Sequence, residues 1–86
     1  MVSRLTDISG LDVFTEDGKR VGVVEDVSID PDSGKVLALA VGRVAEDFLE
    51  KIGVSEGRGV LVPYAGIKSI GSIVLMKNLP YTVKEV

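Results

Sequence analysis

The residues of this chain that could carry chemistry are carboxylates, because histidine and cysteine are both absent. Without an imidazole or a thiol, thiolate nucleophiles, imidazole general bases, disulfides and nearly all zinc sites are excluded. The densest carboxylate motif, Asp30-x-Asp32-x-Gly34, has the spacing that opens a calcium-binding loop. Such a loop needs a bidentate glutamate at its twelfth position, and residues 39–41 are all apolar. We therefore expect a turn here and no metal site.

Two pairs of adjacent carboxylates, Glu25-Asp26 and Glu46-Asp47, raise the alternative of acid–base catalysis. Adjacent residues on a strand point to opposite faces, so Glu25 and Asp26 could share a site only at a β-bulge. At a bulge, we expect Asp26 to accept hydrogen bonds from unpaired backbone N–H groups. Glu46 and Asp47 suit the first turn of a helix, where the helix dipole favours negative charge. We assign no catalytic residue and expect that the protein is not an enzyme.

Glycines and basic residues do not form a phosphate site. The chain lacks both G-x-G-x-x-G and G-x-x-x-x-G-K-[ST], the common glycine-rich phosphate loops. The formal net charge is −3, and the basic residues are spread singly apart from Lys19 and Arg20. An aromatic content of 5% leaves few rings for base stacking. We therefore expect no cofactor and no direct contact with nucleic acid.

The elements that must position these residues are mainly strands, because short aliphatic runs alternate with turn formers. Strands are predicted at 11–15, 20–29, 35–42, 60–63, 67–70 and 72–76. Asp17-Gly18 should form the first hairpin turn, because both residues can take a positive φ. In the second strand, Val24 and Val27 share the inward face only if a bulge lies near Glu25-Asp26. Turn or bulge roles are expected for Gly18, Gly22, Asp26, Gly34 and Gly71.

The third strand, 35–42, is apolar on both faces. Its two faces are Leu37, Leu39 and Val41, and Val36, Ala38 and Ala40. A strand with no polar face needs cover on both sides. One side should belong to a barrel interior, and the other to a helix, a chain end or a second subunit.

A short helix is predicted between Ala45 and Gly53, with Gly53 in the left-handed conformation that ends many helices. Its apolar stripe contains Phe48, Leu49 and Ile52. We favour packing of this stripe on the outer face of the third strand. The alternative is that the stripe is part of a partner interface, for which the candidate residues are Phe48, Leu49, Ile52, Tyr64 and Tyr81.

Length and hydropathy bound the class of protein. The 86 residues suit a single domain over 1–86, with a core at about 5–77 and an apolar tail, 78–86, that closes the sheet or pairs with another chain. The N-terminus lacks the apolar run of a signal peptide, and no run approaches the ~20 apolar residues of a membrane span. We therefore expect a cytoplasmic protein with no membrane insertion.

The order of these motifs resembles the PRC-barrel family. The matching residues are Gly10-x-x-Val13, Asp17-Gly18, Gly22-x-Val24-x-Asp26-Val27-x-Ile29-Asp30 and Gly34-x-Val36, and the stretch 62–75 is similar to the family's closing motif. The resemblance covers about residues 5–77. It implies an all-β fold: a small, strongly bent β-barrel of about six short strands with one short helix, used as a docking module.

Related domains occur in the reaction-centre H subunit of photosynthetic bacteria, in the ribosome maturation factor RimM and in stand-alone archaeal proteins, some of them linked to cell division. This chain is most similar to the stand-alone archaeal type. The resemblance implies a non-catalytic protein–protein interaction module, an adaptor in a cytoplasmic assembly such as the archaeal cell-division machinery, and a homodimer. The alternative is an RNA-processing or ribosome-maturation factor resembling the barrel domain of RimM. Ser72 stands where many relatives carry an acidic residue, so a partner contact through that carboxylate is not carried over.

Overall fold

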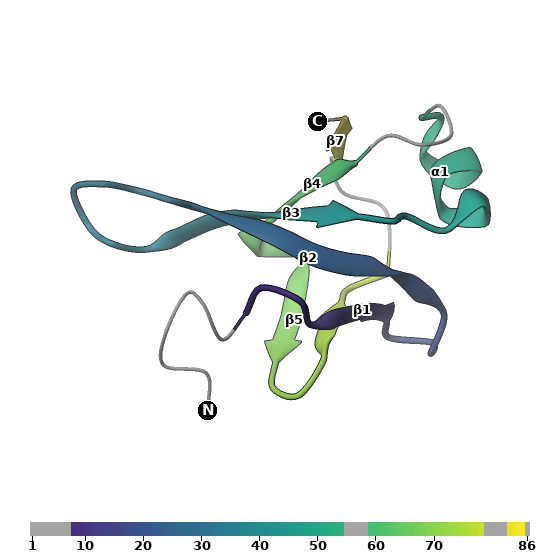
Figure 1. The fold of residues 1–86 in the computed structure, drawn as a ribbon, viewed down its shortest axis with the longest axis horizontal. Helices are drawn as coiled ribbons and strands as arrows, with labels where there is room; N and C mark the ends of the chain where they lie inside the picture. Colours follow the sequence, from purple (N-terminus) through teal and green to yellow (C-terminus); the bar gives the residue numbers. More distant parts are fainter. Residues whose placement is uncertain (1–7, 55–58, 79–82, 86) are drawn as a thin grey trace.

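The computed structural model describes residues 8–54, 59–78 and 83–85, which form one curled sheet and one short helix (Figure 1). Within these residues the strand order is β5-β6-β1-β2-β3-β4-β7. Neighbouring strands are antiparallel except β1 and β6, which are parallel. The elements are β1 (Asp12–Thr15), β2 (Arg20–Ile29), β3 (Val36–Gly42), α1 (Glu46–Ile52), β4 (Val60–Pro63), the 3₁₀ turn η2 (Tyr64–Gly66), β5 (Ile67–Ile70), β6 (Val74–Met76) and β7 (Lys84–Glu85).

The prediction of a mostly β, strongly bent fold with one short helix is confirmed, and the sheet has the shape of a half-barrel. The described chain has seven strands instead of about six, because part of the apolar tail forms β7. β7 pairs antiparallel with β4, where Val60 lies opposite Glu85 and Leu61 opposite Lys84. The tail therefore extends the sheet of its own chain.

The predicted hairpin between β1 and β2 is confirmed. Gly18 has a φ of 88°, whereas Asp17 is not among the residues with positive φ. The loop spans residues 16–18, and the Gly18 N–H donates to the Thr15 carbonyl over 2.9 Å. A three-residue loop of this kind needs one left-handed residue at its end, and Gly18 provides it.

The predicted bulge in β2 is confirmed. Val24 lies opposite Val41 and Asp26 opposite Ala40, which leaves Glu25 as the extra residue. A second irregularity was not predicted: Ser28 pairs with Ala38 and Ile29 with Val36, so Leu37 has no partner on β2. Leu37 is consequently 51% exposed, and the prediction that it shares the buried face of Leu39 is wrong.

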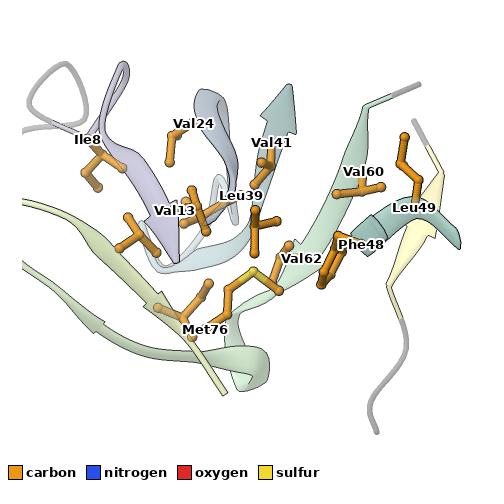
Figure 2. Packing of buried hydrophobic residues seen from close by; sticks show 13 residues of the cluster. Ile8, Val13, Val24, Leu39, Val41, Phe48, Leu49, Val60, Val62 and Met76 are labelled. Carbon is orange, nitrogen blue, oxygen red and sulfur yellow. The ribbon is translucent and has the colours of Figure 1, made fainter. Parts of the chain in front are cut away.

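The core is a single aliphatic cluster on the inner side of the sheet. Figure 2 shows Phe48 and Leu49 of α1 beside Val60 and Val62 of β4, at one end of this cluster. The cluster continues away from the helix through Met76, Leu39, Val41, Val13 and Val24. Each of these residues is at most 6% exposed. The helix therefore seals the same core that the strands enclose.

The position of α1 follows from its two ends. At its start, the Ala45 N–H donates to the Val21 carbonyl over 2.8 Å, which ties the helix to β2. At its end, Gly53 has a φ of 76°, and the Val54 N–H donates to the Leu49 carbonyl over 2.9 Å. This is a Schellman arrangement, as predicted. The short link from β3 holds the helix beside the core, so the prediction that it covers the outer face of β3 is wrong.

Candidate interaction surface

The outward-facing residues of β3 and β4 form a surface that we call the outer face, made of Ala38, Ala40, Leu61 and Pro63. Ala38 lies directly opposite Pro63, and Ala40 opposite Leu61. The residues that alternate with them, Leu39 and Val41 on β3 and Val60 and Val62 on β4, point into the core, where they are at most 1% exposed. Because successive side chains alternate between faces, the outer face is the reverse side of the core-forming strands. All four of its residues are apolar and only half-buried.

The outer face is hollowed into a groove of about 270 Å³ lined by Leu37, Ala38, Leu61, Pro63 and Lys84. Ala38 has the smallest side chain in this lining, so the surface is depressed at Ala38 and the larger side chains surround it. Leu37 stands at one margin of the groove, and its bulge turns it outward. An apolar groove with an exposed leucine at its margin is typical of a protein-binding surface.

A row of directly opposed residues on neighbouring strands crosses this surface and has a negative charge at one end and a positive charge at the other. Asp26 lies opposite Ala40 on β2, and Lys84 lies opposite Leu61 on β7. Directly opposed residues share one face of a sheet, so the row Asp26, Ala40, Leu61, Lys84 crosses four strands on the outer side. Both charged side chains are exposed, and among the described residues neither belongs to an ion pair.

A second recess, of about 360 Å³, separates the β1–β2 loop from α1. It is lined by Thr15, Asp17, Lys19, Arg20, Val21, Asp47, Phe48, Glu50 and Lys51. The Thr15 hydroxyl donates to the Asp17 carboxylate, and this hydrogen bond lowers the pKa of Asp17. Its lining contains three acidic and three basic side chains, so the charges of the lining sum to zero. In the described part of the chain, no group of three potential metal-ligating residues occurs.

Comparison with known proteins agrees with this geometry. A family model described as the PRC-barrel domain matches residues 1–81. The chain belongs to the PRC-barrel domain family. No curated protein shows significant similarity to it. Across the described residues, no helix of this PRC-barrel chain is long and apolar enough to cross a membrane.

The sequence-predicted interface residues fall into three groups. Phe48 and Leu49 are 6% and 1% exposed and belong to the core of their own chain, so they offer no exposed surface. Ile52 is half-buried and packs against the same core. Tyr64 is 57% exposed and directly follows Pro63 of the outer face. Tyr81 lies outside the described residues.

The outer face combines residues that the sequence predictions had not grouped. The apolar character of both faces of β3 was the available signal, and it pointed to Ala38 and Ala40. Leu61 and Lys84 gave no such signal, because their positions beside β3 depend on pairings between distant segments.

Of the residues assigned to turns and the bulge, Gly18, Asp26, Gly34 and Gly71 lie in or beside such positions, whereas Gly22 lies within β2, opposite Val13. The Asp26 carboxylate accepts a hydrogen bond of 2.8 Å from the Val27 N–H beside the bulge. Gly34 has a φ of 73° in the β2–β3 loop, where the Asp30 carboxylate accepts from the Asp32 N–H over 2.9 Å. Gly71 lies in the bend between β5 and β6, and its N–H donates to the Ile73 carbonyl over 2.9 Å. These carboxylates therefore bind backbone groups of the turns.

Gly22 allows a close approach between β2 and β3. A Cβ atom at this position would lie 2.4 Å from the Gly42 carbonyl oxygen and 2.8 Å from the Val41 side chain. Any other residue would push the two backbones apart. The local curl of the sheet therefore depends on the missing side chain.

Glu16 forms a clamp that no sequence pattern predicted. Its Oε1 lies 2.7 Å from Lys68 Nζ on β5, and its Oε2 accepts from the Asn78 N–H over 2.9 Å. The hydrogen bond from Lys68 and then the one from Asn78 hold the pKa of Glu16 below its usual value. The β1–β2 loop is thereby joined to the last third of the chain.

Proposed function

We propose that this PRC-barrel domain is a non-catalytic adaptor that binds proteins through the outer face. The main observation that supports this proposal is that β3 and β4 have apolar side chains on both faces of the sheet. An antiparallel sheet with one solvated face normally alternates apolar and polar residues. Here the positions that would be polar are Ala38, Ala40, Leu61 and Pro63. A small interaction module is also what the PRC-barrel family suggests.

The charged groups of the described surface support a binding role over a catalytic one. The two carboxyls with a lowered pKa, Glu16 and Asp17, each accept a hydrogen bond from a neighbouring side chain. A lowered pKa makes a carboxyl a weaker general base at neutral pH, which is opposite to the tuning that acid–base catalysis uses. We propose a cytoplasmic assembly, such as the archaeal cell-division machinery, as the setting of the adaptor. The outer face does not favour the RNA-related alternative, because Lys84 is the only basic residue in the row that crosses it.

The proposal is tested by placing a charge on the outer face. Leu61→Asp should leave the fold intact, because Leu61 is half-buried and points away from the core. Ser69→Asp, on an exposed position of β5, is the matched control. Tagged wild-type protein and both variants are used to recover proteins from the cell of origin, with quantitative mass spectrometry. Proteins retained by the wild type and Ser69→Asp should be lost with Leu61→Asp, and recovery of one unchanged set by all three would reject the proposal.

A further inference from the structure

We infer that the outer face binds a second copy of this chain, around a two-fold axis that runs parallel to β3 and β4. The inference rests on the proposed function and narrows it to one partner and one orientation. Three features carry it: the charged ends of the row, the symmetry of a dimer, and the shape of the groove.

The row of cross-strand partners has one negative and one positive end. It runs from Asp26 on β2 over Ala40 and Leu61 to Lys84 on β7. Three spacings between neighbouring strands make it ~14 Å wide. A surface with this pattern complements a copy of itself when one of the two rows is reversed.

A two-fold axis parallel to the strands produces that reversal. In such a dimer the same surface meets itself, and the strand order of the second copy runs in the opposite direction. β2 of one copy then faces β7 of the other, so Asp26 lies opposite Lys84 of the second copy, and this contact occurs twice. An axis perpendicular to the strands would instead place Asp26 opposite Asp26 and Lys84 opposite Lys84. Electrostatic complementarity selects the parallel axis.

The shape of the outer face provides both a depression and a projection. Ala38 contributes to the lining of the groove of about 270 Å³, while Leu37 projects from its margin and is 51% exposed. Two copies can therefore place apolar side chains into each other's grooves. The row is ~14 Å wide, and the four residues of β4 extend the outer face by a similar length along the strands. The area of this face is therefore smaller than the ~800 Å² that each partner buries in a standard interface. We therefore expect a reversible dimer with a dissociation constant of about 10 to 500 μM, in the range of weak complexes.

The test exchanges the charges at the two ends of the row. Asp26→Lys alone and Lys84→Asp alone each create two like-charge contacts in the dimer, so each should dissociate about tenfold or more readily than the wild type. An equimolar mixture of the two variants should form a one-to-one heterodimer, because every contact is again between opposite charges. Sedimentation equilibrium from about 10 μM to 1 mM measures all three, a range that brackets the expected dissociation constant.

Two further variants control for net charge and for folding. Lys19→Asp changes the net charge as Lys84→Asp does, but Lys19 directly follows the β1–β2 loop and is not part of the row, so this variant should dimerise as the wild type does. Asp26→Asn removes the charge and keeps an oxygen that can accept the Val27 N–H, so it should weaken the dimer without disturbing the bulge. A wild type that stays monomeric at about 1 mM, or equal weakening by Lys19→Asp and Lys84→Asp, would overturn the inference.

The result separates this inference from the proposed function. If the wild type is monomeric and Leu61→Asp still loses its captured proteins, the outer face binds another protein and the second copy is rejected. If the wild type dimerises, the single reversals weaken the dimer and the mixture recovers, the second copy is the occupant of the outer face.

Discussion

The two faces of β3 and β4 differ in how deeply their side chains are buried, and the two sets of residues alternate along each strand. The inner face consists of Leu39, Val41, Val60 and Val62, each at most 1% exposed, whereas the outer face is half-buried and bears the groove. A shift of one residue in register would exchange the two sets of side chains. The same seven-residue strand β3 therefore supplies side chains to both the core and the outer face.

The largest expected effect compares a leucine on each face. Leu39→Ala removes a side chain that is 0% exposed, and should lower the free energy of unfolding by about 3 kcal/mol through lost burial and the cavity left behind. Leu61→Ala, on the outer face, should cost less than about 1 kcal/mol, because its side chain keeps access to solvent. Urea unfolding of both variants measures the difference. Equal losses would show that the two faces are not distinct.

The next prediction concerns the curl that gives the sheet an inner and an outer side. Gly22→Ala should destabilise the fold by about 2 kcal/mol, because the new Cβ meets the Gly42 carbonyl oxygen, a backbone atom that cannot rotate away. Gly71→Ala is the matched control, since its Cβ would have no heavy atom within 4 Å. Urea unfolding should place the two variants well apart, and similar midpoints would contradict the proposed close approach.

A smaller effect is expected where α1 seals the inner face. Gly53→Ala forces a residue with a side chain into a φ of 76°, and should cost about 1 kcal/mol. Gly53→Asn should cost less, because asparagine tolerates the left-handed conformation. Thermal and urea unfolding of the pair would measure this order, and the reverse order would be inconsistent with the Schellman arrangement.

The smallest effect is a pH dependence at the Glu16 clamp, which lies outside both β3 and β4. Hydrogen bonds from Lys68 and Asn78 lower the pKa of Glu16 in the folded state relative to its usual 4.5. Such a carboxyl stabilises the fold above pH 4.5 and loses its contribution as the pH falls through the lowered, folded-state pKa. The difference in urea midpoint between the wild type and Glu16→Gln should therefore be largest at neutral pH and shrink in acid.

The clamp prediction has an internal control. In a Lys68→Met background, the first cause of the lowered pKa is removed, so Glu16→Gln should change the urea midpoint less than it does in the wild type. A midpoint difference that is independent of both pH and the Lys68 substitution would assign the stabilisation to packing.

Local patterns predicted much of this fold. The boundaries of β2, β4 and β5 agree with the predictions at 20–29, 60–63 and 67–70, because alternation and turn residues are properties of neighbouring positions. The bulge was equally predictable, since Val24 and Val27 could not otherwise share a face.

Features that depend on distant segments could not be predicted in this way. The parallel pairing of β1 with β6 and the addition of β7 to β4 join residues far apart in sequence. The side of the sheet on which α1 packs was predicted wrongly, because an apolar stripe shows that a helix docks but not where. For the candidate site, the apolar pattern of β3 predicted an uncovered face. The row with charged ends could not be predicted, because it depends on the pairing of Lys84 with Leu61.

The short strand β7 has a further consequence for how molecules of this protein associate. An unprotected sheet edge can recruit strands from other molecules without limit, which leads to fibrils. Here β7 occupies the Val60 and Leu61 positions, and the adjoining Pro63 has no backbone N–H to offer an incoming strand. Because β7, the new edge, is only two residues long and both residues are charged, this margin of the sheet is a poor template for open-ended polymerisation.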